Sequence, residues 1–169
     1  REPYTWRSGS SQLLRRRQLM VGSVLFHVGV LIVFFGHLGG LLTPIWIFEW
    51  IGIGHSFKQI MAMVVGGVAG GFALVGALIL CHRRLSDARI RRNSSFGDIA
   101  ILLLLTAQLV LGLATIAISM QHLDGEEMVT FMSWAQGIFT FDPAASSYIA
   151  GAHWIFKLHL FLGLTIFLI

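Results

Sequence analysis

Residues 19–42 read LMVGSVLFHVGVLIVFFGHLGGLL, a run without Asp, Glu, Lys or Arg that contains two histidines, His27 and His37. A hydrocarbon core of ~30 Å needs about 20 apolar residues in one helix, and this run is long enough. Residues 60–81, 99–119 and 148–169 form three further apolar segments of similar length. The sequence therefore predicts an all-α membrane protein, an up-down transmembrane four-helix bundle that forms a single domain over residues 1–169.

The composition argues against a water-soluble protein. Of 169 residues, 56% are hydrophobic and 12% are charged, with a mean hydropathy of +0.78, whereas soluble domains carry about 25% charged residues. The nineteen glycines fit helices that approach closely in lipid, where small residues line the interfaces. A single cysteine, Cys81, excludes a disulfide framework and a thiolate metal cluster built by this chain alone.

The position of the basic residues predicts the orientation. Arginines precede the first segment at residues 15–17 and separate the second from the third at residues 83–92, whereas residues 120–147 carry four acidic residues and no basic one. By the positive-inside rule, the arginine-rich loop is cytoplasmic and the acidic loop is outside. Only Lys58 and Lys157 fall on the outer half. The net charge of +4 thus marks topology, and we expect lipid around the chain and no nucleic-acid partner.

The two outer connections are more than simple turns. Residues 43–50, TPIWIFEW, are aromatic and amphipathic, which predicts a short helix or loop at the level of the lipid headgroups. Residues 126–137 predict a second surface helix. Both outer connections are therefore expected to lie against the membrane interface.

Histidines inside the predicted spans are the first candidates for function, because ionisable groups are costly there. His27 and His37 differ by about 15 Å along the helix axis and about 280° around it, so one helix can offer axial ligands to two stacked cofactors. His159 lies at a depth close to that of His37, and the two are expected to pair across one haem. Glycines beside the first two ligands would give a flat porphyrin room, namely Gly29, Gly36, Gly39 and Gly40.

Other interpretations of the histidines remain open. Zinc or copper sites favour three or four nearby ligands, and the interiors of the first three segments contain no Asp or Glu, so bis-histidine haem b fits better. In a cofactor-free membrane anchor, the same three histidines would only bridge helices. The remaining four are expected to make hydrogen bonds at interfaces or in loops; they are His55, His82, His122 and His153.

Motifs along nearly the whole chain resemble one family. They are Phe26-His27-Val28-Gly29, Gly36-His37, Leu42-Thr43-Pro44 with Trp46, Lys58-Gln59 before Met61-Ala62-Met63, Gln121-His122-Leu123-Asp124-Gly125, Trp134-Ala135-Gln136 and Lys157-Leu158-His159-Leu160. In this order they resemble the gamma subunit of the respiratory membrane-bound nitrate reductase, a dihaem cytochrome b of the bacterial or archaeal cytoplasmic membrane.

The resemblance implies a fold of five transmembrane helices, of which this chain would hold four. Tyr4-Thr5-Trp6-Arg7 resembles the cytoplasmic stretch after the first helix, so the chain is expected to be a fragment of a longer protein. The resemblance assigns His37 and His159 to the iron of a distal haem near the outer face. It assigns His27 to a proximal haem whose second ligand is expected beyond Ile169.

The resemblance also implies an activity. Quinol would be oxidised near the distal haem by a site of Lys58, Gly36 and His37, with protons released outside. Electrons would pass through the distal and proximal haems to a cytoplasmic iron–sulfur beta subunit, and nitrate would be reduced on a molybdenum-containing alpha subunit. The alternative within this class is a cytochrome b subunit of another quinone-linked complex, similar to those of sulfite or heterodisulfide reductases.

Overall fold

The computed structural model describes residues 11–169, and all regular secondary structure within them is α-helical, which confirms the predicted fold class. The expectation for Tyr4–Arg7 lies outside the described residues. In chain order, the helices are α1 (Arg16–Leu42), α2 (Ile45–Trp50), α3 (His55–Ser86), α4 (Ala88–Arg92), α5 (Phe96–Ser119), α6 (Glu126–Thr140), α7 (Ala145–Tyr148) and α8 (Trp154–Leu168).

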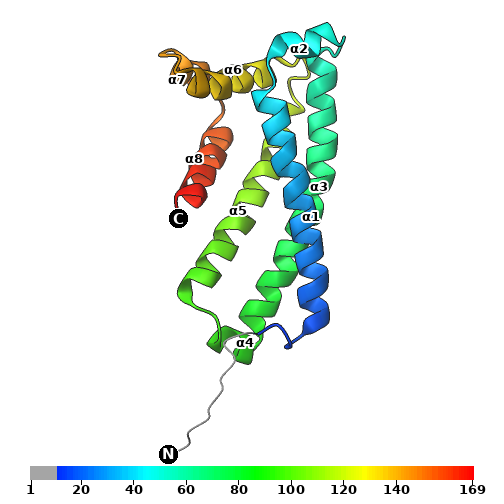
Figure 1. Cartoon of the computed structure of the whole chain (residues 1–169), viewed down its shortest axis with the longest axis vertical. Helices are drawn as coiled ribbons and strands as arrows, with labels where there is room; N and C mark the ends of the chain where they lie inside the picture. Colours follow the sequence, from blue (N-terminus) through cyan, green and yellow to red (C-terminus); the bar gives the residue numbers. More distant parts are fainter. Residues whose placement is uncertain (1–10) are drawn as a thin grey trace, which may run out of the picture.

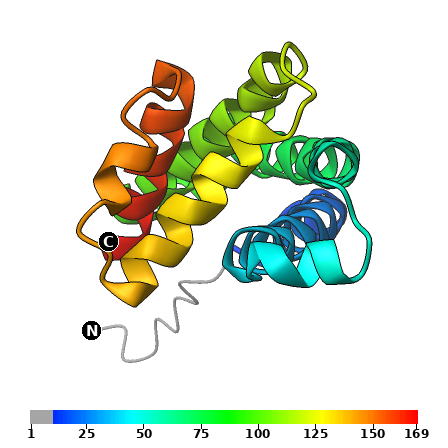
Figure 2. The ribbon, with the colours of Figure 1, turned by 90° about the horizontal axis from the view of Figure 1, so that it is seen from above.

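The four helices that correspond to the predicted segments alternate in direction. Figure 1 shows α1 rising, α3 descending, α5 rising and α8 descending. They pack in chain order, α1 on α3, α3 on α5 and α5 on α8. Seen from above, α6 lies across one end of the bundle, between α1 and α8 (Figure 2). The four helices therefore form an open row, and α6 crosses it at one end.

The helix surfaces are suited to lipid. Within residues 11–169, three helices are long and apolar enough to cross a membrane, namely α1, α3 and α5, whereas α8 is apolar but has 15 residues. The most apolar stretch of α5 contains no buried residue, and that of α1 is 11% buried. Large apolar side chains such as Phe35 and Phe72 are more than half exposed. Such extensive apolar exposure is typical of a membrane surface and not of a water-facing one.

A seam of small residues joins α1 to α3. A Cβ atom added to Gly76 would lie 2.4 Å from the backbone nitrogen of Phe26, and one added to Gly29 would lie 2.5 Å from the carbonyl oxygen of Ala69. The two backbones thus touch at positions where no side chain fits. This corrects the expectation for Gly29, which makes room for α3 and not for a cofactor.

Three helix boundaries lie five residues or more from those of the predicted segments, and one of them is the end of α3, at Ser86 and not at residue 81. The second segment was expected over residues 60–81, yet α3 begins at His55, because Lys58 and Gln59 in its first turns are buried by other parts of the chain. The last segment was expected from residue 148, yet α8 begins at Trp154, with His153 as its N-cap. Residues 149–153 form turns between α7 and α8.

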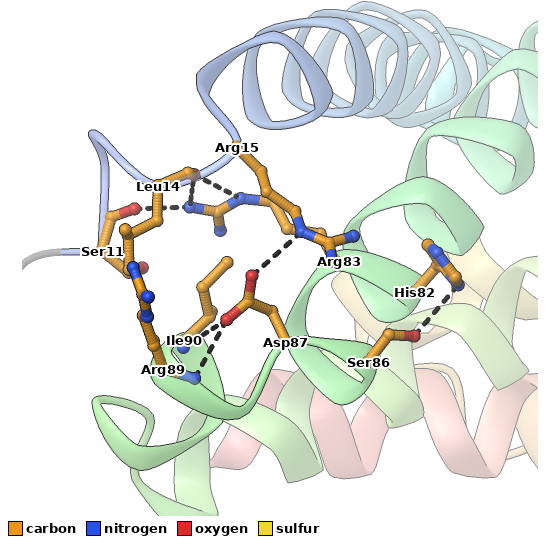
Figure 3. A network of polar contacts seen from close by, with 9 residues as sticks. All are labelled: Ser11, Leu14, Arg15, His82, Arg83, Ser86, Asp87, Arg89 and Ile90. Atoms are coloured by element: carbon orange, nitrogen blue, oxygen red, sulfur yellow. Dashed lines mark hydrogen bonds and ion pairs between the residues drawn. The ribbon is translucent and has the colours of Figure 1, made fainter.

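The arginine-rich end of the bundle is held by a polar network (Figure 3). The Arg83 side chain is 2% exposed and donates to the carbonyl oxygens of Ser11 (2.6 Å) and Leu14 (2.9 Å). Arg15 Nε pairs with Asp87 Oδ2 at 2.9 Å. These contacts fix the start of α1 against the end of α3.

The opposite end carries the two connections expected at the interface, and both contain helices, α2 and α6. Gln136 on α6 donates from Nε2 to the carbonyl oxygens of Leu41 (3.0 Å) and Thr43 (3.1 Å). These carbonyls lie at the C-terminal end of α1, where no further N–H group of the helix is available to bond them. The side-chain amide therefore ties α6 to the end of α1 and covers the bundle there.

Candidate functional site

A cavity of about 580 Å³ opens inside the row of helices, below α6. Its walls come from α1, α3, α5, α6 and α8 and are largely apolar. Few of its lining residues carry titratable or amide side chains; these are His37, Gln59, Gln108, Glu127 and His159. A pocket of this size, apolar with a few convergent polar groups, is typical of a cofactor or ligand site.

His37 and His159 face each other across this cavity. Their ring centres are 6.4 Å apart and the ring planes differ by 41°. Two imidazoles that bind one iron from opposite sides, through bonds of about 2.0 Å, have ring centres roughly 6 Å apart. The pair predicted from the sequence is therefore brought together at a spacing that suits a shared metal.

A backbone contact fixes the tautomer of His37. Its Nδ1 lies 2.8 Å from the carbonyl oxygen of Val33, one turn back on α1. A carbonyl can only accept, so Nδ1 carries the proton and Nε2 keeps a free lone pair. His27 makes the same contact with the carbonyl oxygen of Ser23 at 2.7 Å. Metal-binding histidines use such second contacts to hold the ring in place.

His159 lies against Gly112 and Gln108 of α5. A Cβ atom at Gly112 would be 3.0 Å from the His159 ring, so a larger residue there would push against the ring. Gln108 Nε2 donates to the His159 carbonyl oxygen at 3.0 Å and lies 3.4 Å from its Nε2. The ring Nδ1 is buried and has no protein partner. A buried nitrogen without a partner is costly, which suits a group that receives a ligand.

Gln108 and Gly112 were not predicted as site residues. Gln108 is an amide in the middle of the apolar segment 99–119, and this isolated polarity is the signal that could have found it. Gly112 carries no such signal, because glycines are common throughout the spans.

This donor set fits haem better than a bare metal ion. Within the described part of the chain, no group of three His, Cys, Asp or Glu side chains could hold a metal. A haem needs only axial protein ligands, because the porphyrin supplies the others. The opposed imidazoles and the largely apolar walls of the cavity suit a flat iron-bearing ring.

Lys58 is buried beside the cavity and does not line it. Its side chain is 4% exposed, and Nζ donates to the carbonyl oxygen of Gly40 at 2.8 Å and approaches Met132 Sδ at 2.8 Å. The ring of Phe48 covers the ammonium at 3.7 Å. Through Gly40, the cation is tied to the turn of α1 that follows His37. Gly36 was also predicted for the quinol site. It has open space where a side chain would be.

Comparison with known proteins identifies the family. The model of the nitrate reductase gamma subunit family matches residues 1–169. The chain belongs to this family. The respiratory nitrate reductase 2 gamma chain of Escherichia coli K12 is 47% identical over 166 residues, which is 98% of this chain and 73% of the relative. The respiratory nitrate reductase 1 gamma chain of the same organism is also 47% identical, over 167 residues, with the same coverage.

A more distant relative agrees. The nitrate reductase gamma chain of Bacillus subtilis is 36% identical over 168 residues, which is 99% of this chain and 75% of the relative. The chain is therefore a gamma subunit of an oxidoreductase, and its apolar helices are those of a membrane protein.

The other histidines of this gamma subunit lie away from the cavity. His27 is exposed on α1, with its ring edge-on to Phe26 at 5.3 Å. His55 Nε2 lies 3.6 Å from Glu49 Oε1, and the side chain of His82 lies within hydrogen-bonding distance of Ser86. The structure thus brings together His37 and His159, and places His27 on the same helix but outside their cavity.

Proposed function

We propose that the chain is the membrane anchor and quinol-oxidising haem b subunit of a respiratory nitrate reductase. The observation that carries this proposal is the pair of opposed imidazoles, His37 and His159, across a largely apolar cavity. Membership of the nitrate reductase gamma family supports it and disfavours the alternative of another quinone-linked complex.

His37 and His159 would hold the distal haem between them. A bound haem accepts electrons one at a time and passes them on, because its iron changes oxidation state. The Val33 carbonyl oxygen orients the His37 ring, and the side-chain amide of Gln108 contacts the His159 ring at Nε2. His27 would hold a second, proximal haem. Its fixed Nδ1 contact with Ser23 leaves Nε2 free for this role.

Quinol binds beside the distal haem, where Lys58 donates to a quinol oxygen and Gly36 and His37 form the adjoining surface. An ammonium has three donors, and Gly40 and Met132 engage two of them. A quinol oxygen would take the third in place of the Phe48 ring, which covers the ammonium at 3.7 Å, and the positive charge would help to deprotonate this oxygen. The open backbone at Gly36 lets a flat ring approach α1.

The arginine-rich end faces the cytoplasm and meets the iron–sulfur beta subunit, which passes electrons to the molybdenum-containing alpha subunit. The arginines of the described residues lie at this end, in residues 15–17 and 83–92, two of them paired with Asp87 and Asp98, and the other acidic residues of residues 11–169 lie toward the end covered by α6. By the positive-inside rule the arginine-rich end is cytoplasmic. Electrons would then travel inward from the quinol site, and the quinol protons would leave on the outer side.

The test is the reduced-minus-oxidised absorption spectrum of the purified complex. We expect a b-type band, and we expect His37→Ala and His159→Ala each to remove the same distal component. His122→Ala is the control, because His122 is exposed in a loop away from the cavity. A wild-type complex without a b-type band would support the cofactor-free anchor, and loss of different components in the two variants would contradict the pairing.

A further inference from the structure

Glu127 brings a carboxylate to the outer end of the cavity. It lies in the first turn of α6 and lines the same cavity as His37 and His159. Of the neighbouring acidic residues in residues 120–130, Asp124 and Glu126 are exposed, whereas Glu127 is half-buried. We propose that Glu127 is the residue that accepts a proton from quinol during its oxidation. This inference rests on the proposed function, because it requires quinol at this end of the cavity.

The carboxylate of Glu127 has capacity left to accept a proton. Ser119 Oγ donates to Glu127 Oε2 at 3.0 Å. None of the ion pairs within residues 11–169 includes Glu127. A carboxylate with two oxygens can accept several hydrogen bonds. A group held by one neutral donor, and not neutralised by a neighbouring cation, can take up a proton without breaking a salt bridge.

A chain of contacts connects Glu127 to the turn that holds Lys58. Gln59 follows Lys58 and is 2% exposed; its Nε2 donates to the carbonyl oxygen of Ser119 at 3.0 Å. The hydroxyl of the same Ser119 donates to Glu127. In addition, Met132 on α6 contacts the Lys58 ammonium, one helical turn beyond the cavity residue Met128. The proposed donor to quinol and the proposed proton acceptor thus belong to one connected group at the outer end.

The charges around Glu127 come from several elements. Lys58 lies under α6 from α3, and His37 of α1 and His159 of α8 share the cavity. Asp124 and Glu126 lie on the chain just before Glu127 and reach solvent. The chain just before Glu127 is thus exposed, so a proton taken up at Glu127 lies close to solvent.

The chemical step balances as follows. Oxidation of a quinol to a quinone breaks two O–H bonds and releases two electrons and two protons. The electrons leave in two one-electron transfers to the acceptor of the proposed function, a b-type haem. The two protons leave one after the other: each forms an O–H bond with the Glu127 carboxylate and then passes to solvent, which frees the carboxylate again. Lys58 stabilises the quinol oxygen while the O–H bond of the quinol breaks.

The experiment uses the assembled complex and menadiol as the quinol. Stopped-flow absorption follows haem reduction in the wild type, Glu127→Gln, Glu127→Asp and Glu126→Gln. Glu126 is a matched control, because it occupies the same first turn of α6 but is exposed. We expect Glu127→Gln to reduce its haem about 100-fold more slowly, within the range of general acid–base catalysis, with haem content unchanged. Glu127→Asp should recover most of the rate, and Glu126→Gln should match the wild type.

A second readout follows the proton itself. Infrared difference spectra during menadiol oxidation should show the C=O band of a protonated carboxyl group in the wild type and not in Glu127→Gln. If Glu127→Gln reduces its haem at the wild-type rate, or the band persists, the inference is overturned and the proposed function stands. If menadiol does not reduce the haem of the wild-type complex, the proposed function itself fails.

Discussion

The helix pair α1–α3, the closed half of the bundle, and the pair α5–α8, its open half, use small residues in different ways. Between α1 and α3, glycines and alanines bring the backbones into contact, and a Cβ atom at Gly76 would lie 2.4 Å from a main-chain nitrogen. Between α5 and α8, Gly112 makes room for a histidine ring, and a cavity of about 580 Å³ opens in front of it. Small residues thus allow close backbone packing between α1 and α3, and between α5 and α8 they leave room for a ring beside the cavity.

This difference separates scaffold from site. The α1–α3 seam fixes the helix that carries His27 and His37, because backbone contacts cannot adjust as flexible side chains do. The α5–α8 half positions His159 through side chains, chiefly the Gln108 contacts. We therefore expect substitutions in the closed half to affect folding and those in the open half to affect the cofactor.

The largest effect is expected in the closed half, for Gly76→Val. The added side chain would collide with the backbone of α1 at Phe26 and Gly22, and overpacking against a backbone cannot be relieved by a rotamer change. The variant should fail to accumulate in the membrane, as measured by immunoblot and fluorescence-detected chromatography. Gly71→Ala is the control, because a Cβ there meets nothing within 4 Å; equal accumulation of both variants would contradict the seam.

The next effect is expected where the two halves meet, for Lys58→Ala. This substitution removes the ammonium that donates to Gly40 and, by our proposal, to quinol. Haem reduction by menadiol should slow at least ~10-fold, while the absorption spectrum of the haem stays intact. Lys157→Ala is the comparison, since Lys157 donates to Ala150 and is exposed. An unchanged rate in Lys58→Ala would exclude Lys58 from the quinol site.

A smaller effect is expected in the open half, for Gln108→Leu. The variant loses the hydrogen bond to the His159 carbonyl oxygen and the contact with its ring. Loss of a contact that orients a metal ligand weakens metal binding by about 10–100-fold. We expect a shifted midpoint potential and faster loss of the distal haem on dilution, with normal accumulation. Gln121→Leu, in an exposed turn, should behave as wild type; identical potentials in all three proteins would refute this role for Gln108.

The smallest effect is expected at the base of the closed half, at Asp87. Burial raises the pKa of this carboxyl, but hydrogen bonds from the backbone of Arg89 and Ile90 and from the Arg15 side chain outweigh it, so the pKa is lowered from 3.8. The carboxylate therefore stabilises the folded chain above about pH 4, and this contribution is lost as the pH falls through the lowered pKa. Measured at several pH values, the temperature of thermal unfolding should fall slightly more steeply at acid pH in the wild type than in Asp87→Asn. Parallel curves for the two proteins would contradict this role of Asp87.

The sequence predicted the helices well because apolar length decides them. The runs around His27 and within residues 99–119 are helical where expected, and α6 was predicted from its surface pattern. The sequence could not predict the early start of α3. Lys58 and Gln59 are buried by contacts with Gly40, Ser119 and Met132, which are distant in the chain.

The candidate site was predicted only in part. Matching depths on antiparallel helices were enough to pair His37 with His159, because their positions follow from helix geometry. The expectation that Gly29 flanks a cofactor was wrong, since helical spacing alone does not say which face of α1 meets α3. Gln108 and Gly112 depend on how α5 and α8 pack, which periodicity does not determine.

The most direct test of the account is a cryo-electron microscopy map of the assembled complex at the cavity between α1 and α8. We predict planar density with an iron peak between His37 and His159, about 2.0 Å from one nitrogen of each ring, and Gly112 against the His159 ring. A map in which the two rings contact each other or water, with the cavity filled by side chains or lipid, would contradict the account.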